Sequence, residues 1–206
     1  MLKEVFDRTA ALIGILTLWP VMLVTGILIA LGMPGGPVLF RQQRVGRHGR
    51  LFTMVKFRTM LPNHSGSSVS VAGESRITPL GATLRRWKLD ELPELWNVLK
   101  GDMSFVGPRP DVPGYADRLT GDDRRVLLLK PGITGPATLK YRDEEQLLSL
   151  QADPVAYNDR VIFPDKVRIN LEYLENRSFA RDLRIIIQTL LPNRPTLATD
   201  STAAAS

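Results

Sequence analysis

The sequence predicts an α+β protein, in which an N-terminal membrane helix precedes a small β-hairpin and a mainly helical domain. The first of three observations is a run without any charged residue from Thr9 to Phe40. The second is a pair of short apolar segments around an arginine- and glycine-rich turn, between residues 37 and 60; this pattern is typical of a hairpin. The third is the helical spacing of apolar residues in the later segments.

The uncharged run is long enough to cross a bilayer. Its core, TAALIGILTLWPVMLVTGILIALGM, would extend for about 38 Å as a continuous helix. Glu4 and Asp7 argue against a secretory signal, because such signals begin with a positively charged region. Basic residues, and no acidic residue, occupy the charged positions between Arg41 and Arg58. The positive-inside rule therefore places the body of the protein in the cytoplasm.

Pro20 lies near the middle of the uncharged run. A proline removes one helical hydrogen-bond donor and clashes with the carbonyl four residues earlier. One interpretation is a kinked helix that spans the membrane, since prolines are common in such helices. The other is a helix that bends at Trp19 and Pro20 and returns to the cytoplasmic face. Composition alone favours the first interpretation.

The first half of the domain is expected to alternate turns and short elements. Two strands between Pro37 and Met60 are followed by a polar, flexible loop over residues 62–75. A helix is expected from Thr78 or Pro79 to Trp87. Asp90 is then placed to cap a second helix, with Pro93 in its first turn. Its apolar face and its stop signal are Leu92, Leu95, Trp96, Leu99 and Gly101.

The second half of the domain is expected to begin with a proline-stiffened turn, SFVGPRPDVPG, and a rigid Pro-Gly loop. Two helices follow, at about residues 164–175 and 178–191. The last has an apolar face that would suit either the protein core or a membrane surface. Its residues are Phe179, Leu183, Ile186 and Leu190. The chain after Pro192 is expected to be disordered.

Composition limits the chemistry that the protein can perform. The chain has no cysteine and two histidines, which excludes thiolate catalysis and disfavours a zinc site. Any metal would need oxygen ligands, which indicates Mg²⁺ or Mn²⁺. The formal net charge of +6 favours an anionic partner such as a nucleic acid, a phospholipid or a phosphorylated substrate.

Asp90 and Glu91 are adjacent carboxylates at the expected start of a helix, where the helix dipole favours ionised acids. They follow three basic residues, Arg85, Arg86 and Lys88. Two adjacent ionised acids repel each other unless a cation lies beside them, and Mg²⁺ bound to carboxylates and substrate phosphates suits that position. The simpler explanation is that Asp90 caps the helix and Glu91 decorates its first turn. Spacing alone favours the simpler explanation.

The surrounding motifs change that balance. The stretch KLDELPELWNVLKGDMSFVGPRP, from Lys88 to Pro110, lies between VKFRTM and KPGITG. Together they closely resemble the bacterial sugar transferase family, the small monotopic phosphoglycosyltransferases, over nearly the whole chain. The resemblance implies transfer of a sugar 1-phosphate from a UDP-sugar to polyprenyl (undecaprenyl) phosphate, with release of UMP. Such a reaction initiates the biosynthesis of a glycoconjugate.

The resemblance also implies roles for individual residues. Asp90 aligns with the nucleophile, whose carboxylate attacks the β-phosphorus and forms a covalent phosphosugar-aspartyl intermediate. Glu91 would be a general base or an orienting group for polyprenyl phosphate, and both acids would contact Mg²⁺, with Mn²⁺ as the alternative. The basic residues expected to contact phosphate or nucleotide are Lys56, Arg58, Arg109 and Arg142. The simpler alternatives are that Arg58 flanks the membrane and that Arg109 braces the proline turn.

In this family the apolar segment is re-entrant, broken at a Ser-Pro pair, with both ends in the cytoplasm. The chain keeps Pro20 but has Trp19 in place of the serine, and it has Asn170 where many members have Asp. The resemblance thus implies a membrane anchor over residues 1–36 that contacts membrane lipid. It implies a cytosolic catalytic domain over residues 37–191 with interfacial amphipathic helices, and a disordered tail over residues 192–206. The expected location is the bacterial inner membrane, as a monotopic protein with its domain on the cytoplasmic face.

Two other classes of function were weighed. A nucleic-acid binder would use the arginines from Arg41 to Arg50, but the sequence has no recognisable reading helix or aromatic platform, so no nucleic-acid partner is expected. A non-catalytic membrane-anchored scaffold or assembly factor would leave the polar cluster around Asp90 unused. A homo-oligomer, the identity of the sugar and the pathway (exopolysaccharide, O-antigen, capsule or glycoprotein glycan) all stay open.

Overall fold

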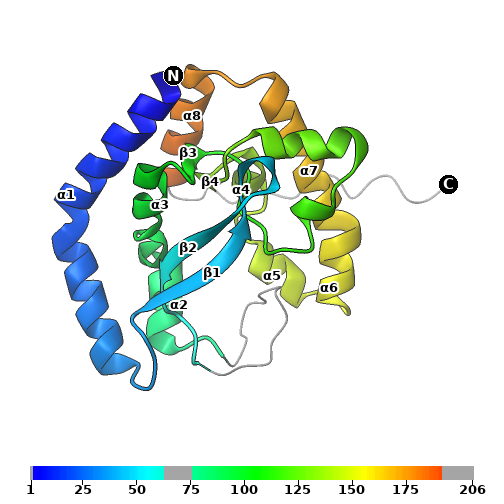
Figure 1. Ribbon diagram of the computed structural model, residues 1–206. Helices are drawn as coiled ribbons and strands as arrows, with labels where there is room; N and C mark the ends of the chain where they lie inside the picture. Colours follow the sequence, from blue (N-terminus) through cyan, green and yellow to red (C-terminus); the bar gives the residue numbers. More distant parts are fainter. Residues whose placement is uncertain (1, 63–75, 192–206) are drawn as a thin grey trace.

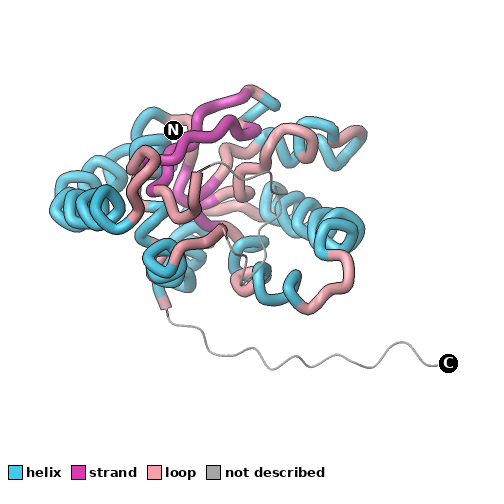
Figure 2. The backbone as a smooth tube through the Cα atoms, turned by 90° about the horizontal axis from the view of Figure 1, so that it is seen from below, coloured by secondary structure: helices cyan, strands magenta, loops and turns pink. Residues whose placement is uncertain are grey.

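The computed structural model describes residues 2–62 and 76–191 of the 206-residue chain. All but the first residue of the loop expected over 62–75 lies outside the described residues, and so does the tail expected over 192–206. The described residues form a mostly helical α+β fold with a long N-terminal apolar helix, as the sequence predicts. Figure 1 shows that helix, α1, curving along one side of the domain. Figure 2 shows the strands near the middle, with helices on either side.

The longer elements in chain order are α1 (Leu2–Gly32), β1 (Leu39–Val45), β2 (Leu51–Phe57), α2 (Pro79–Arg86), α3 (Glu94–Lys100), β3 (Ser104–Val106), β4 (Gly132–Thr134), α4 (Pro136–Lys140), α5 (Glu144–Ser149), α6 (Pro154–Tyr157), α7 (Phe163–Glu175) and α8 (Phe179–Leu190). Short 3₁₀ turns occupy Arg47–Gly49, Leu89–Glu91, Ala116–Arg118 and Gly121–Leu128, and a π-helical turn occupies Asn158–Ile162.

The predicted hairpin is confirmed. Strands β1 and β2 pair antiparallel in a register that sets Leu39 opposite Phe57 and Val45 opposite Leu51. The turn between them includes His48, whose φ of 60° lies in the left-handed region. The hairpin carries Lys56 near the end of β2, where the chain turns toward α2.

The segment beginning with Ser104 was predicted to be only a turn, and that prediction is wrong in its first residues. Ser104–Val106 forms strand β3, which pairs in parallel with β4. Two glycines, Gly107 just after β3 and Gly132 at the start of β4, allow the two backbones to approach closely. A Cβ on Gly107 would lie 2.2 Å from the Lys130 carbonyl oxygen, and one on Gly132 would lie 2.2 Å from the Gly107 nitrogen. Any side chain at either glycine would push the strands apart and displace the loop that follows β3.

Helix α1 runs through Pro20 without interruption, whereas the resemblance implies a break there. It is the single helix among the described residues that is long and apolar enough to cross a membrane. Most of its apolar side chains face outward; Leu16, Trp19 and Val24 are each more than half exposed. Ala11 and Ile29 are fully buried against the domain. The helix therefore has one narrow face on the protein and a broad apolar face turned away from it.

Both ends of α1 are attached to the same domain. Near its N-terminus, Lys3 forms an ion pair of 2.6 Å with Asp182 of α8, and Glu4 forms one of 2.8 Å with Lys130. Beyond its C-terminus, the Met33 carbonyl accepts a hydrogen bond from Arg58. The domain therefore contacts α1 at both ends of the helix.

Helix α3 packs between α1 and the hairpin. Its residues Leu95 and Val98 join a buried cluster with Ala11 and Phe52. Asn97, which is 1% exposed, fastens α3 to β2: its side chain accepts a hydrogen bond from the Val55 amide and donates one to the Thr53 carbonyl. These two hydrogen bonds fix α3 beside β2, near the charged residues of the Lys88–Pro110 motif.

Three helix predictions are confirmed, and one is wrong in detail. Helix α2 begins after Thr78, and helices α7 and α8 match the two helices expected near the C-terminus. The helix expected to start at Asp90 instead begins at Glu94, with Pro93 as its N-cap residue. Asp90 makes no capping hydrogen bond, because it lies in a separate 3₁₀ turn that follows Lys88 in a left-handed conformation.

Helix α8 carries an outward apolar face. Asp182 and Ile185 are buried against the domain, whereas Phe179, Leu183 and Leu190 are exposed. Phe179 also meets Phe6 of α1 edge to face, with ring centroids 5.0 Å apart. The sequence allowed either a core or a surface position for this face, and the structure places most of it on the surface next to the start of α1.

Candidate active site

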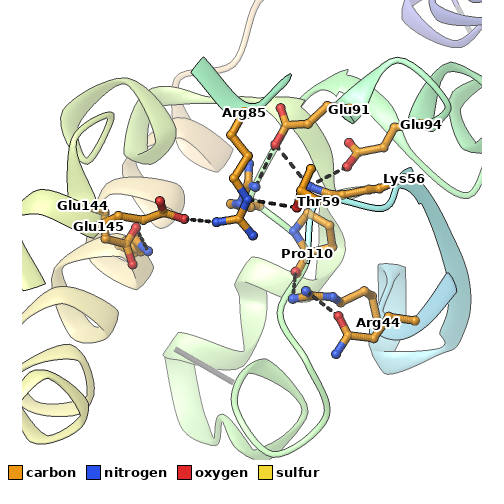
Figure 3. Close-up of polar contacts among 12 residues, drawn as sticks. Arg44, Lys56, Thr59, Arg85, Glu91, Glu94, Pro110, Glu144 and Glu145 are labelled. Atoms are coloured by element: carbon orange, nitrogen blue, oxygen red, sulfur yellow. Dashed lines mark hydrogen bonds and ion pairs between the residues drawn. The ribbon is translucent and has the colours of Figure 1, made fainter. Parts of the chain in front are cut away.

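The charged residues of the central motif converge from four parts of the fold. Lys56 comes from β2, Asp90 and Glu91 from the 3₁₀ turn, Glu94 from α3, and Arg109 from the loop after β3. Figure 3 shows Lys56 lying between Glu91 and Glu94. The sequence places Lys56 and Arg109 on opposite sides of the acidic pair and far from it along the chain. The fold brings both side chains to Glu91.

Glu91 is held by two cations. Its Oε1 lies 3.1 Å from the Lys56 Nζ and 2.8 Å from the Arg109 Nη2. Burial by itself would raise the pKa of Glu91, but the charges of Arg109 and Lys56 outweigh burial and lower the pKa well below its usual range. The Glu91 charge in turn raises the pKa of Arg109. Glu91 is therefore a firmly ionised carboxylate in a paired network.

Glu94 completes this network through a second ion pair with Lys56. Its carboxylate is 2% exposed, and its Oε1 lies 3.0 Å from the Lys56 Nζ. Burial raises the pKa of Glu94, while Lys56 lowers it less strongly. Because Glu94 also pairs with Lys56, it can hold the ammonium group in place when Glu91 binds another partner. No local pattern predicts this role, since an acid in the first turn of a helix is ordinary.

Asp90 has the opposite environment, although it is the next residue. It is 7% exposed, and its Oδ1 is buried without a hydrogen-bond partner. Burial raises the pKa of Asp90, and the neighbouring charge of Glu91 raises it further, against the weaker opposing effects of Lys56, Arg85 and Lys88. A desolvated carboxylate without a partner is more basic and more available for attack than an ion-paired one.

Two further basic residues flank the turn, and sequence reasoning assigned neither to the site. Arg85 of α2 donates to the Thr59 hydroxyl at 3.1 Å and to Glu145 at 2.6 Å. Lys88 directly precedes the turn, and its exposed side chain lines a cavity that Asp90 and Glu91 also line. The cluster of basic residues just before Asp90 was the available signal for both.

Two of the predicted basic residues lie outside this network. Arg58 is 5% exposed and donates to the Met33 carbonyl beyond the end of α1, and its Nε and Nη1 have no partner within the described residues. Arg142 donates to the carbonyls of Gln188 and Leu191 at the end of α8. Both residues line the large cavity beside Asp90, but their hydrogen bonds go to backbone carbonyls.

The cavity itself has a volume of about 2130 Å³. Asp90, Glu91, Lys88 and Arg109 line it. Asp111 follows Arg109 in the same wall, and burial raises the pKa of Asp111 to about 6. The space is large enough for a nucleotide sugar, since pockets for drug-sized ligands usually occupy about 300–1,000 Å³.

The chain on its own supplies few metal ligands. Within residues 2–62 and 76–191, no group of three or more histidine or acidic side chains is arranged to hold a metal ion. The unpartnered Oδ1 of Asp90 is an oxygen ligand of the kind Mg²⁺ accepts, and Glu91 adjoins it. Mg²⁺ commonly takes one or two carboxylates together with substrate phosphates, and the residues present fit that mode.

An exposed apolar helix runs along the domain, and the cavity of the domain is lined by a desolvated carboxylate and several cations. These two features are characteristic of a membrane-associated enzyme that acts on phosphorylated substrates. The sequence profile of one family, described as bacterial sugar transferase, matches residues 1–193. The chain belongs to that family, which consists of polyprenyl-phosphate sugar-1-phosphate transferases.

Individual relatives are similar over most of this chain. The sugar transferase EpsL of Bacillus subtilis is 36% identical over 190 residues, covering 92% of this chain and 86% of EpsL. A UDP-N-acetylgalactosamine-undecaprenyl-phosphate N-acetylgalactosaminephosphotransferase of Aeromonas hydrophila is 36% identical, over 92% of this chain and 43% of the relative. A UDP-glucose:undecaprenyl-phosphate glucose-1-phosphate transferase of Xanthomonas campestris pv. campestris is 37% identical, over 91% and 37%. This chain thus spans less than half the length of the last two.

Proposed function

We propose that this protein transfers a sugar 1-phosphate from a UDP-sugar to undecaprenyl phosphate at the cytoplasmic membrane face, releases UMP, and so initiates a glycoconjugate. The observation that carries the proposal is the contrast within the acidic pair: Asp90 is buried and unpartnered, while Glu91 is ion-paired to Lys56 and Arg109. A reactive carboxylate next to two cations suits attack on a diphosphate. The relatives named for this reaction act on different sugars, so the proposal names UDP-sugars as a class.

In the first step, an Asp90 carboxylate oxygen attacks the β-phosphorus of the UDP-sugar. A bond forms between that oxygen and the phosphorus, and the bond from the phosphorus to the bridging oxygen breaks, so that UMP leaves with the bond electrons. The raised pKa of Asp90 makes its carboxylate more basic, and its burial limits its hydration. The product is a phosphosugar ester of Asp90.

In the second step, a phosphate oxygen of undecaprenyl phosphate attacks the same phosphorus and displaces Asp90. Glu91 orients this acceptor or accepts its proton. That role requires Glu91 to exchange one of its present cationic partners for the substrate, and Glu94 supports the exchange because it retains Lys56 at 3.0 Å. The two carboxylates thus act in succession, Asp90 as nucleophile and Glu91 on the acceptor.

Lys56 and Arg109 are the proposed ligands of the transferred diphosphate. Both already face an anion, the Glu91 carboxylate, and Arg109 presents a planar guanidinium suited to phosphate oxygens. Arg58 and Arg142 are also proposed to contact substrate, Arg58 through its two unpartnered nitrogens. Their present hydrogen bonds to backbone carbonyls indicate that each also holds a helix end.

Asp90 and Glu91 are the residues that would hold Mg²⁺, or Mn²⁺ in its place. When bound, the ion supplies positive charge that neutralises the phosphates and stabilises the UMP leaving group. The buried, unpartnered Oδ1 of Asp90 is consistent with such a partner. The expected dependence on divalent ions is tested by adding a chelator and then restoring each ion separately.

The proposed arrangement in the membrane is re-entrant. The anchor comprises residues 1–36 and the cytosolic catalytic domain residues 37–191, and the protein resides in the bacterial inner membrane. The ion pairs of Lys3 and Glu4 with the domain, together with the Arg58 bond beyond the far end of α1, support this arrangement. A helix spanning the bilayer would have to break the contacts at one end. Tags at both termini should be accessible only from the cytoplasm, and a periplasmic N-terminus would refute the re-entrant arrangement.

The test of the activity is a screen of UDP-glucose, UDP-galactose and the UDP-N-acetylhexosamines with undecaprenyl phosphate and Mg²⁺, scored by UMP release. The expected result is release with at least one donor and formation of a lipid-linked sugar. The Asp90→Asn variant is the matched control, because it keeps the size of the side chain. Equal release by this variant would contradict the proposal.

A further inference from the structure

The residue just before the catalytic turn has an unusual backbone conformation. Lys88 has φ 56° and ψ 21°, in the left-handed region. That region is crowded for any residue with a Cβ and is normally occupied by glycine, or by asparagine or aspartate. Within the described residues, the other non-glycine residue with positive φ is His48, in the hairpin turn. Local turn geometry therefore favours glycine at position 88, so the lysine side chain is there for some other reason.

Lys88 also differs from Lys56, Arg109 and Arg85 in forming no ion pair within the described residues. Lys56 is paired with Glu91 and Glu94, Arg109 with Glu91, and Arg85 with Glu145. Lys88 has no ion pair or side-chain hydrogen bond in the described parts of the chain, and its side chain is exposed on the wall of the cavity. It is nevertheless close enough to Asp90 and Glu91 to lower the pKa of both.

We propose that Lys88 binds a phosphate group of the substrate at Asp90, in addition to the Lys56–Arg109 pair. The left-handed backbone directs the chain from α2 into the turn, and the lysine supplies an ammonium group that forms no ion pair within the described residues. The group bound is either the donor diphosphate or the acceptor monophosphate, which share this chemistry. This inference rests on the proposed transferase function and adds a binding residue to it.

The test uses Lys88→Gly, which suits the left-handed backbone and removes the ammonium group. The folded state should tolerate this change, so the thermal midpoint should be no lower than that of the wild type. Binding of UDP with Mg²⁺, measured calorimetrically, and the KM for undecaprenyl phosphate form two separate arms. A role on the donor predicts UDP binding weakened about 10-fold; a role on the acceptor predicts a similar rise in that KM. Lys88→Arg, which keeps the charge, should retain most of the wild-type binding.

His48→Gly is the matched control, because it relieves the same backbone conformation at an exposed residue that does not line the cavity. It should change neither arm. Unchanged UDP affinity together with unchanged acceptor KM in Lys88→Gly would overturn the inference. Equal losses in His48→Gly and Lys88→Gly would overturn it too, since they would indicate a general backbone effect. If instead the wild-type protein releases no UMP from any UDP-sugar, the proposed function fails, a result distinct from either outcome for Lys88.

Discussion

The two acids of the Leu89–Glu91 turn are adjacent in the sequence but lie in different environments. On one side, Glu91 forms ion pairs with Lys56 and Arg109, and Lys56 is also paired with Glu94. On the other, Asp90 is as deeply buried, but its Oδ1 has no partner. Burial raises the pKa of both acids, but the charges of Arg109 and Lys56 outweigh it at Glu91, whereas at Asp90 the charge of Glu91 adds to it. Adjacent carboxylates can thus be divided by their surroundings into a binding group and a reactive group.

The largest expected effect is that of Asp90→Asn. The variant keeps the size of the side chain but loses the attacking charge, so turnover should fall by at least about 1,000-fold. A carboxylate whose folded-state pKa is raised destabilises the folded protein once pH exceeds its unfolded value. The thermal midpoint of the substrate-free variant at neutral pH should therefore rise above that of the wild type. A lower midpoint would contradict the unpaired environment of Asp90.

Glu91→Gln should have the opposite effect on stability. It removes the shared partner of Lys56 and Arg109, so the free energy of unfolding should fall by about 3–5 kcal/mol, as for other broken buried ion pairs. Turnover should fall by roughly 100-fold or more, mainly in the acceptor step. Denaturant unfolding and single-turnover kinetics measure the two quantities. A stability change with the same sign in both acid variants would remove the distinction between them.

Lys56→Ala and Arg109→Ala separate binding from stability within the paired side. Each should raise the donor KM by about 10-fold, because each removes one charge-assisted bond to phosphate. Lys56→Ala should also destabilise the protein more, because it leaves Glu94, which is 2% exposed, without its cation. Adding Glu94→Gln should restore stability to Lys56→Ala but not its donor KM. Full recovery of activity in the double variant would show that Lys56 acts only on structure.

The smallest expected effect is a shift in the pH profile of the first step. Because Asp90 must be ionised to attack and its pKa is raised, UMP release in a single turnover should decline with acid at a pH above the ordinary aspartate value of about 3.9. Glu91→Gln should move that decline toward lower pH, since the Glu91 charge is one cause of the shift. A profile that ignores Glu91 would indicate that the two carboxylates do not interact.

The sequence predicted the parts of this fold that have a regular pattern of apolar residues or that begin and end at turn and capping residues. The uncharged run, the hairpin around its glycines and the helices begun by Thr78 and Ser178 all carry local signals, and the structure has each of them. The pairing of β3 with β4 was missed because three-residue strands joined across a long interval have no period to detect. The cap expected at Asp90 failed because that residue lies inside the separate Leu89–Glu91 turn, and α3 begins only at Glu94.

The chemistry of the site was partly predictable for a similar reason. The motif around Asp90 and Glu91 identified the acidic pair, and VKFRTM and GPRP supplied Lys56 and Arg109, which the fold brings to Glu91. Glu94 could not be assigned in advance, because its partner Lys56 is distant in the chain. Arg58 shows the converse: a basic residue inside a motif whose hydrogen bond goes to the Met33 carbonyl rather than to the acidic pair.

The most direct test of the central claim is the mass of the intact protein after incubation with a UDP-sugar and Mg²⁺ in the absence of undecaprenyl phosphate. The account predicts a mass increase equal to one sugar phosphate, located on Asp90 and accompanied by release of one equivalent of UMP. It also predicts that the adduct disappears when undecaprenyl phosphate is added and never forms in Asp90→Asn. Release of UMP that depends strictly on the acceptor, with no adduct under any condition, would contradict the assignment of Asp90 as the nucleophile.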